Sequence, residues 1–160
     1  MSQTTHDPFQ EYRTVIQSLS ALAVSITRTE EAKTAAVSNN RHELLDECIQ
    51  EEQAFLLKLR GLEQHRIRLQ AELGWDSLTL TQILDTASPE QTEALQPVFQ
   101  ELDRQLRRLQ TAREAAEQIL KVRLHELKVF SQTGTAYDNG GNISQNGGVQ
   151  GTGRIRSTYV

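Results

Sequence analysis

Apolar residues recur at heptad spacing through the middle of this 160-residue chain. A stripe of this period predicts an amphipathic helix with a coiled-coil seam over residues 41–73. Glu52 and Arg66 interrupt the stripe, and we expect both to pair or to reach solvent at the edge of the seam. Gly74 then stands where a glycine is expected to end the helix. The nine seam positions are Leu45, Cys48, Glu52, Phe55, Leu59, Leu62, Arg66, Leu69 and Leu73. All of them except Glu52 and Arg66 are apolar.

A second seam of the same kind follows. The segment from Ser88 to Gln91 is a strong helix start, because it places Ser at the N-cap, Pro at the first helical position and Gln at the third. The predicted helix covers residues 89–131, and its part from Val98 to Ser131 is roughly 50 Å long. Pro97 predicts a kink or a restart of this helix. The seam positions are Leu95, Phe99, Leu102, Leu106, Leu109, Arg113, Ala116, Leu120, Arg123, Leu127 and Phe130.

A further long helix is predicted over residues 8–37, with Asp7 as its N-cap and Pro8 at its first position. The segment Ser38-Asn39-Asn40 predicts a break, after which Asn40 and Glu43 have the spacing of a capping box. One helix that continues through this segment is the alternative.

A connector joins the two seam helices. Within it we expect a short helix over residues 79–87, because Leu80, Ile83 and Leu84 recur at helical spacing. Leu78, Thr79 and Leu80 also alternate as a strand would, but the sequence offers no partner strand. We expect Trp75 to close the end of the bundle; a binding site marked by the only tryptophan is the alternative.

Glycine is nearly absent before residue 133, and seven of the nine glycines lie after Gln132. The expected fold is therefore all-α: an elongated antiparallel bundle or coiled coil of three long helices with a short connector helix, over residues 1–132. Residues 133–160 have no helical period, and we expect a disordered, Gly-rich C-terminal tail.

The sequence contains few residues that could form a catalytic or metal-binding site. Cys48 is the only cysteine, which excludes an internal disulfide and indicates a reducing compartment. The four histidines occur in no metal-binding motif, and the glycine pairs of the tail lack the flanking strand and helix of a phosphate loop. The longest apolar runs have four residues, too few to cross a bilayer, and the N-terminus does not resemble a secretory signal. A net charge of −4 and mixed-sign helix surfaces argue against nucleic-acid binding. We expect no catalytic residue, metal or cofactor.

The long helical surfaces remain as candidate functional features. Apolar residues in the last third of the final helix point in more than one direction, so one face can pack in the bundle while another meets a partner helix. Coverage of the second face by the first helix is the alternative. The residues concerned are Ile119, Leu120, Val122, Leu124, Leu127, Val129 and Phe130.

The segment EEQAFLLKLRGLEQHRIRLQAELG, Glu51 to Gly74, is similar to the FlgN family of flagellar export chaperones. That family has an E-E-x-x-L-L-x-x-L-x-x-L-E-x-x-R-x-x-L run before a glycine and a Thr-Leu-containing connector. Lys33 with Ala35 to Val37 resembles a region upstream of it, and Tyr137-Asp138 before glycines resembles the C-terminal end. The resemblance covers roughly residues 10–141. It departs at residues 111–114, where the family often has asparagines.

The resemblance implies a small cytoplasmic bacterial chaperone that binds hook-associated proteins through a terminal helical segment of the cargo. Such a chaperone prevents premature assembly and delivers its cargo to the flagellar type III export apparatus. The residues implied for cargo binding are Ile119, Leu120, Leu124, Leu127 and Phe130, with Tyr137 for cargo or for docking at the export gate. A second copy of the chain is a further candidate partner. The competing hypotheses are a structural or tethering coiled-coil protein that acts by self-association, and an enzyme or metalloprotein.

Overall fold

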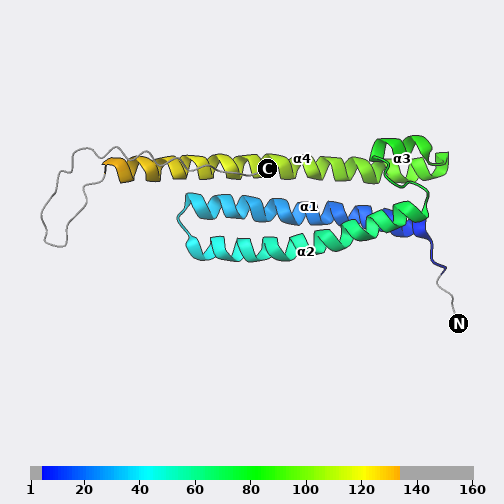
Figure 1. Ribbon diagram of the computed structural model, residues 1–160, viewed down its shortest axis with the longest axis horizontal. Helices are drawn as coiled ribbons and strands as arrows, with labels where there is room; N and C mark the ends of the chain where they lie inside the picture. Colours follow the sequence, from blue (N-terminus) through cyan, green and yellow to red (C-terminus); the bar gives the residue numbers. More distant parts are fainter. Residues whose placement is uncertain (1–4, 134–160) are drawn as a thin grey trace, which may run out of the picture. The chain divides into compact units, whose positions relative to one another are not determined.

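A computed structural model describes residues 5–133 of the chain. The helices are α1 (Pro8–Ser38), α2 (His42–Glu72), α3 (Leu80–Thr86) and α4 (Pro89–Thr133), and the described residues contain no strand. The chain divides into two compact units, Met1–Val122 and Arg123–Val160. In the first unit, α2 runs antiparallel to α1 and to α4 (Figure 1). The all-α fold with three long helices and a short connector helix is confirmed. The expected tail lies almost wholly outside the described residues, so its disorder and the boundary at residue 132 stay predictions.

The turn between α1 and α2 confirms the predicted break but corrects its mechanism. Asn40 has φ 55°, and its N–H bonds the carbonyl of Val37 at 3.3 Å. The N–H of Arg41 bonds the carbonyl of Ala36 at 2.9 Å. These two bonds around a left-handed residue form a Schellman motif, which Asn tolerates better than other non-glycine residues. Asn40 therefore ends α1, and the predicted capping box is wrong: the N-cap of α2 is Arg41, without a side-chain cap.

The end of α2 has the same motif with glycine in the special position. Gly74 has φ 76°, its N–H bonds the carbonyl of Ala71 at 3.2 Å, and the N–H of Trp75 bonds the carbonyl of Gln70 at 2.8 Å. The prediction that Gly74 ends the helix is confirmed. A side chain here would be strained by the positive φ even though nothing lies within 4 Å of the Cβ position.

The starts of α3 and α4 are both capping boxes. At Ser88 the box is the predicted one: Gln91 donates its N–H to Ser88 Oγ at 3.2 Å, and Ser88 donates its own N–H to Gln91 Oε1 at 3.1 Å. Thr79 and Gln82 repeat the arrangement at α3, so the strand alternative for this segment is wrong. The restart expected near Pro97 does not occur, because α4 continues through this residue. Pro97 has no N–H to donate to the carbonyl of Glu93. Because both residues are exposed, water can hydrate that carbonyl instead.

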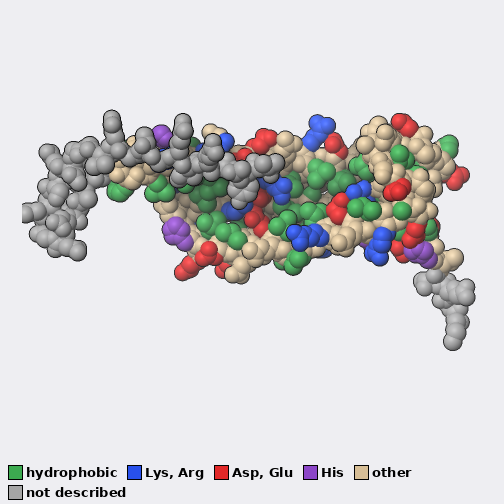
Figure 2. Space-filling model, in the orientation of Figure 1, with side chains coloured by type: hydrophobic (Ala, Val, Ile, Leu, Met, Phe, Trp, Pro, Cys, Tyr) green, Lys and Arg blue, Asp and Glu red, His purple; other side chains and the backbone are tan. Residues whose placement is uncertain are grey.

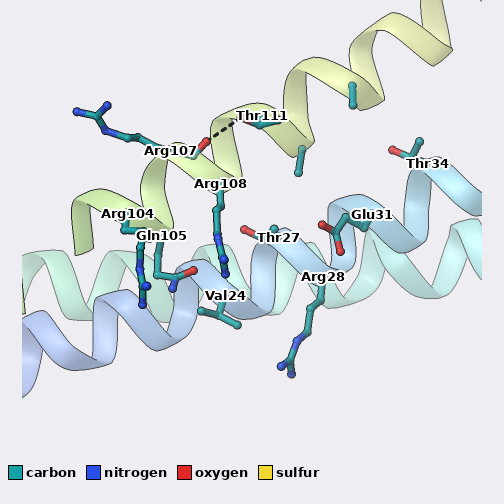
Figure 3. A pocket seen from close by; sticks show the side chains of 12 residues that line it. Val24, Thr27, Arg28, Glu31, Thr34, Arg104, Gln105, Arg107, Arg108 and Thr111 are labelled. Carbon is teal, nitrogen blue, oxygen red and sulfur yellow. Dashed lines mark hydrogen bonds between the residues drawn. The ribbon is translucent and has the colours of Figure 1, made fainter. Parts of the chain in front are cut away.

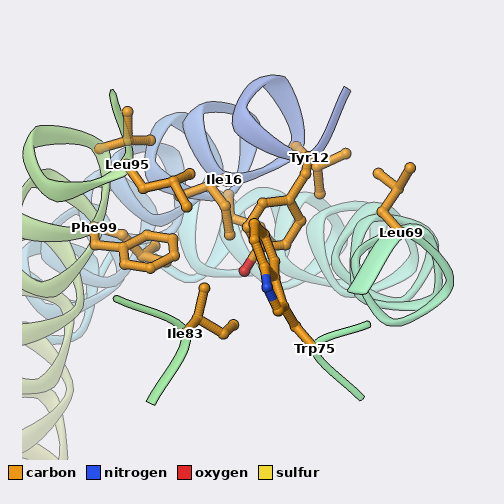
Figure 4. Close-up of a cluster of buried hydrophobic side chains, with 11 residues drawn as sticks. Tyr12, Ile16, Leu69, Trp75, Ile83, Leu95 and Phe99 are labelled. Carbon is orange, nitrogen blue, oxygen red and sulfur yellow. The ribbon is translucent and has the colours of Figure 1, made fainter. Parts of the chain in front are cut away.

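Trp75 closes one end of the first unit, as the sequence predicts. Its side chain is 4% exposed and lies 5.6 Å from the ring of Tyr12 at an edge-on angle of 67° (Figure 4). The Tyr12 ring also meets Phe99, at 6.3 Å. The Tyr12 hydroxyl donates to Gln70 Oε1 at 3.2 Å, and burial raises the pKa of Tyr12 to about 12. The cluster joins side chains of all four helices and of the segment between α2 and α3, namely Tyr12, Val15, Ile16, Leu19, Leu69, Trp75, Ile83, Leu95, Val98, Phe99 and Leu102.

The two polar interruptions of the α2 seam are paired, as predicted. Glu52 accepts a hydrogen bond from Lys33 Nζ at 2.6 Å, and Arg66 Nη2 lies 2.8 Å from Glu63 Oε2. Burial acts to lower the pKa of Lys33, but its hydrogen bonds to Glu52 and Glu30 outweigh burial and leave the pKa raised. The seam between these charged positions packs Phe55, Leu59 and Leu62 against Leu22, Ile26 and Leu109.

Candidate functional site

The second unit carries the most exposed apolar side chains of α4. Leu124 is 63% exposed, Leu127 65% and Phe130 76%. Their neighbours include an ion pair between Arg123 Nη1 and Glu126 Oε2 at 3.1 Å. Because the resemblance implies that they bind cargo, we call Leu124, Leu127 and Phe130 the cargo surface. That this face meets a partner helix stays a prediction, and coverage by the first helix stays its alternative.

The remaining candidates from the sequence are placed differently. Ile119 and Leu120 belong to the first unit, where Ile119 is half-buried and Leu120 is 44% exposed. Within residues 89–132, the last buried residue of α4 is Ala116, although the apolar period of the sequence continues for fourteen residues to Phe130. Tyr137 lies outside the described residues.

Ionisable groups do not converge on a catalytic arrangement within residues 5–133. No group of three or more His, Cys, Asp or Glu side chains in this part of the chain could hold a metal ion. His6 lies between Glu11 (3.0 Å) and Glu72 (3.2 Å), and its pKa is raised by the hydrogen bonds to Glu72 and Glu11. Burial raises the pKa of the Cys48 thiol, and nearby glutamates, Glu51 first, raise it further, which disfavours the reactive thiolate. Among the described helices, none is long and apolar enough to span a bilayer.

Two surfaces were missed by the sequence reasoning. One is a set of exposed apolar side chains on α2, where Leu57 reaches 69% exposure; the others are Leu44, Ile49, Leu56 and Ile67. The heptad series predicted from the sequence contains the positions on the side of α2 that packs in the bundle, so it does not include these exposed residues. The second is a groove of about 800 Å³ between α1 and α4 in the first unit (Figure 3). In the sequence, its arginines have the pattern of an ordinary solvated helix surface. Only the fold brings the two helices together, so the groove cannot be seen in either segment alone.

Long helices that expose apolar side chains between charged ones are typical binding surfaces for other polypeptides. By this criterion the chain is a helical protein-binding module. Residues 9–145 match the sequence model of the family described as FlgN protein, and the chain belongs to the FlgN family. Members of this family are flagellar export chaperones for hook-associated proteins and are not enzymes. Searches among curated proteins and among solved structures found no match.

Proposed function

We propose that the chain holds its hook-associated cargo through the cargo surface of α4, with Ile119 and Leu120 contributing earlier on the same helix. The observation that carries this proposal is the exposure of Leu124, Leu127 and Phe130 at helical spacing. A cargo segment that assembles by helix pairing has an apolar stripe of its own. Covering that stripe would prevent premature assembly until delivery to the type III export apparatus.

The expected affinity follows from the buried area. Complete burial of a Leu or Phe side chain contributes about 1.5–3 kcal/mol, so the three residues contribute roughly 5–9 kcal/mol before ordering costs. Micromolar binding requires about −8 kcal/mol. The three side chains therefore supply a large part of this free energy, and Ile119, Leu120 and the contacts around them have to supply the rest.

Calorimetric titration of the chain with the terminal helical segment of a hook-associated protein tests the proposal. We expect a dissociation constant of about micromolar or tighter, and a negative heat-capacity change because apolar surface is buried. The matched control is the same segment with its apolar stripe replaced by serine, which should not bind. Equal binding of both segments would contradict an apolar interface.

We also propose that Tyr137 docks at the export gate and that the chaperone works in the cytoplasm. The support is the position of Tyr137 within the region that matches the family, four residues after the end of α4. Tyr137→Ala should retain cargo binding in the titration above but reduce pull-down of the export gate, whereas Tyr159→Ala, outside the matching region, should change neither. Loss of cargo binding in the Tyr137 variant would assign this residue to the cargo instead.

A second copy of the chain is a further proposed partner, supported by the exposed apolar side chains on α2. Sedimentation distinguishes this role from the alternative of a coiled-coil tether. A stable dimer or larger oligomer that does not change with concentration and needs no cargo would favour the tether. A weak dimer that cargo displaces fits the chaperone.

A further inference from the structure

The groove between α1 and α4 is built from those two helices alone. Its lining includes Val24 and Thr34 of α1 and Arg104 and Ala115 of α4, and contains no residue of α2. Since α2 packs against α1 and α4 through Phe55, the groove opens on a side of the first unit that α2 does not occupy. A helix laid into it would take the place of a fourth helix in a bundle.

Short side chains in the lining suit a closely packed helix. They are Ala112 and Ala115 from α4 and Val24, Thr27 and Thr34 from α1. The axial distance between packed helices decreases with the size of the side chains at their contact, so these residues permit a close approach.

The charged residues of the groove lining are mainly basic, although the whole chain has a net charge of −4. Arg104 and Arg108 extend from α4 toward α1, and Arg28 extends outward from α1 (Figure 3). Glu31 is the only acidic residue of the lining. On the face drawn in Figure 2, arginine and lysine side chains likewise lie among hydrophobic ones.

Two of these arginines are available to a ligand. Arg104 pairs with Glu101, and Arg107 pairs with Asp103 at 2.9 Å. Among residues 5–133, Arg28 and Arg108 make no ion pair or side-chain hydrogen bond, although Arg108 acts electrostatically on Glu101, the carboxylate that Arg104 already binds. A carboxylate from a partner would therefore meet them without breaking an existing pair.

A second cavity, of about 580 Å³, continues the groove along the same two helices. It shares Val24 with the first, and its charged lining residues are Arg13, whose buried Nε has no hydrogen-bond partner, and Glu101, which pairs with Arg104. From Arg13 to Thr34 the two cavities follow α1 for roughly 30 Å, the length of a helix of about 20 residues.

We propose that this groove binds an amphipathic helix of a partner protein that carries Glu or Asp side chains on both flanks of a narrow apolar face. The proposal does not depend on the cargo surface. Residues 134–160 of the chain itself fit poorly, because they contain one acidic residue, Asp138, and two basic ones, Arg154 and Arg156. A second copy of the chain is the other candidate occupant, and the oligomeric state of the groove variant distinguishes it from a partner protein.

Synthetic helical peptides of about 20 residues, the length estimated from the helical rise, test the proposal with the full-length chain. One peptide has an Ala and Leu face flanked by Glu, and its partner has Lys in place of every Glu. We expect the Glu peptide to bind, the Lys peptide not to bind, and binding to weaken between about 50 mM and about 500 mM salt. Arg28→Glu with Arg108→Glu should weaken binding of the Glu peptide about tenfold or more.

The matched control is Arg60→Glu with Arg68→Glu, which makes the same change of charge at exposed positions of α2. It should leave the affinity for the Glu peptide within about twofold of that of the original chain. A change of charge away from the groove acts on the peptide only through the long-range electrostatic field. A chain with Leu124→Asp and Leu127→Asp should still bind the Glu peptide, which separates this proposal from the function of the cargo surface.

Equal binding of the two peptides, or equal weakening by the groove and control variants, would overturn the proposal. So would binding that appears only after residues 134–160 are removed, since the tail would then be the occupant. Self-association that the groove variant abolishes, without peptide binding, would assign the groove to a second copy and overturn it as well.

Discussion

Replacing Leu124 and Leu127 together by aspartate should abolish co-purification of the hook-associated cargo while the far-UV helix signal persists. Both side chains are more than half exposed, so the free chaperone loses little packing. In the complex each leucine would be buried, and the two contribute about 3–6 kcal/mol. This corresponds to a roughly 10²- to 10⁴-fold weaker complex.

The matched control for this pair is Leu57→Asp with Ile67→Asp, which introduces the same charges at two exposed apolar positions of α2. It should leave cargo binding at least as strong as that of the original chain. Normal cargo binding by the Leu124 and Leu127 variant would show that the surface is assigned to the wrong part of α4.

Replacing Trp75 by alanine should lower the free energy of unfolding by about 3–5 kcal/mol, a large part of the 5–15 kcal/mol typical of a domain. The indole is 4% exposed and has edge contacts with Tyr12 and with Phe9. Its removal leaves a cavity where the end of α2 meets α1. Urea unfolding followed by far-UV circular dichroism measures the loss, because the chain has no other tryptophan for fluorescence.

Leu57→Ala provides the stability control, since a side chain that is 69% exposed should change the free energy of unfolding by less than about 0.5 kcal/mol. Trp75→Phe should recover part of the loss, because a ring still fills the site. A Trp75→Ala variant as stable as the control would mean that the bundle end closes without this residue.

Local signals in the sequence predicted the helix ends well where one residue decides the geometry. Asp7 caps α1 with its side chain, Ser88 and Gln91 form the predicted box, and Gly74 takes the left-handed conformation. The segment at Asn40 was harder because asparagine suits both a helix start and a left-handed helix end. Only the bonds of Asn40 and Arg41 to the preceding helix distinguish the two.

The candidate site was predictable only in part. Apolar spacing marked Leu124, Leu127 and Phe130 as interesting, but the same spacing continues without a change from buried to exposed positions. The sequence contains no sign that burial on α4 ends at Ala116. The basic groove could not be predicted from the sequence for a related reason. Its residues Arg28 and Arg108 are 80 residues apart in the chain, so no local pattern contains both.

The sequence by itself determined the helices, their main breaks and the absence of an internal disulfide, because these depend on period, on caps and on residue counts. The tertiary structure decided which faces are covered. Burial depends on how far one helix extends beside another, and a groove depends on two helices meeting side by side. Neither is a property of any one segment, so the surfaces that this chaperone offers to partners emerge only from the packed bundle.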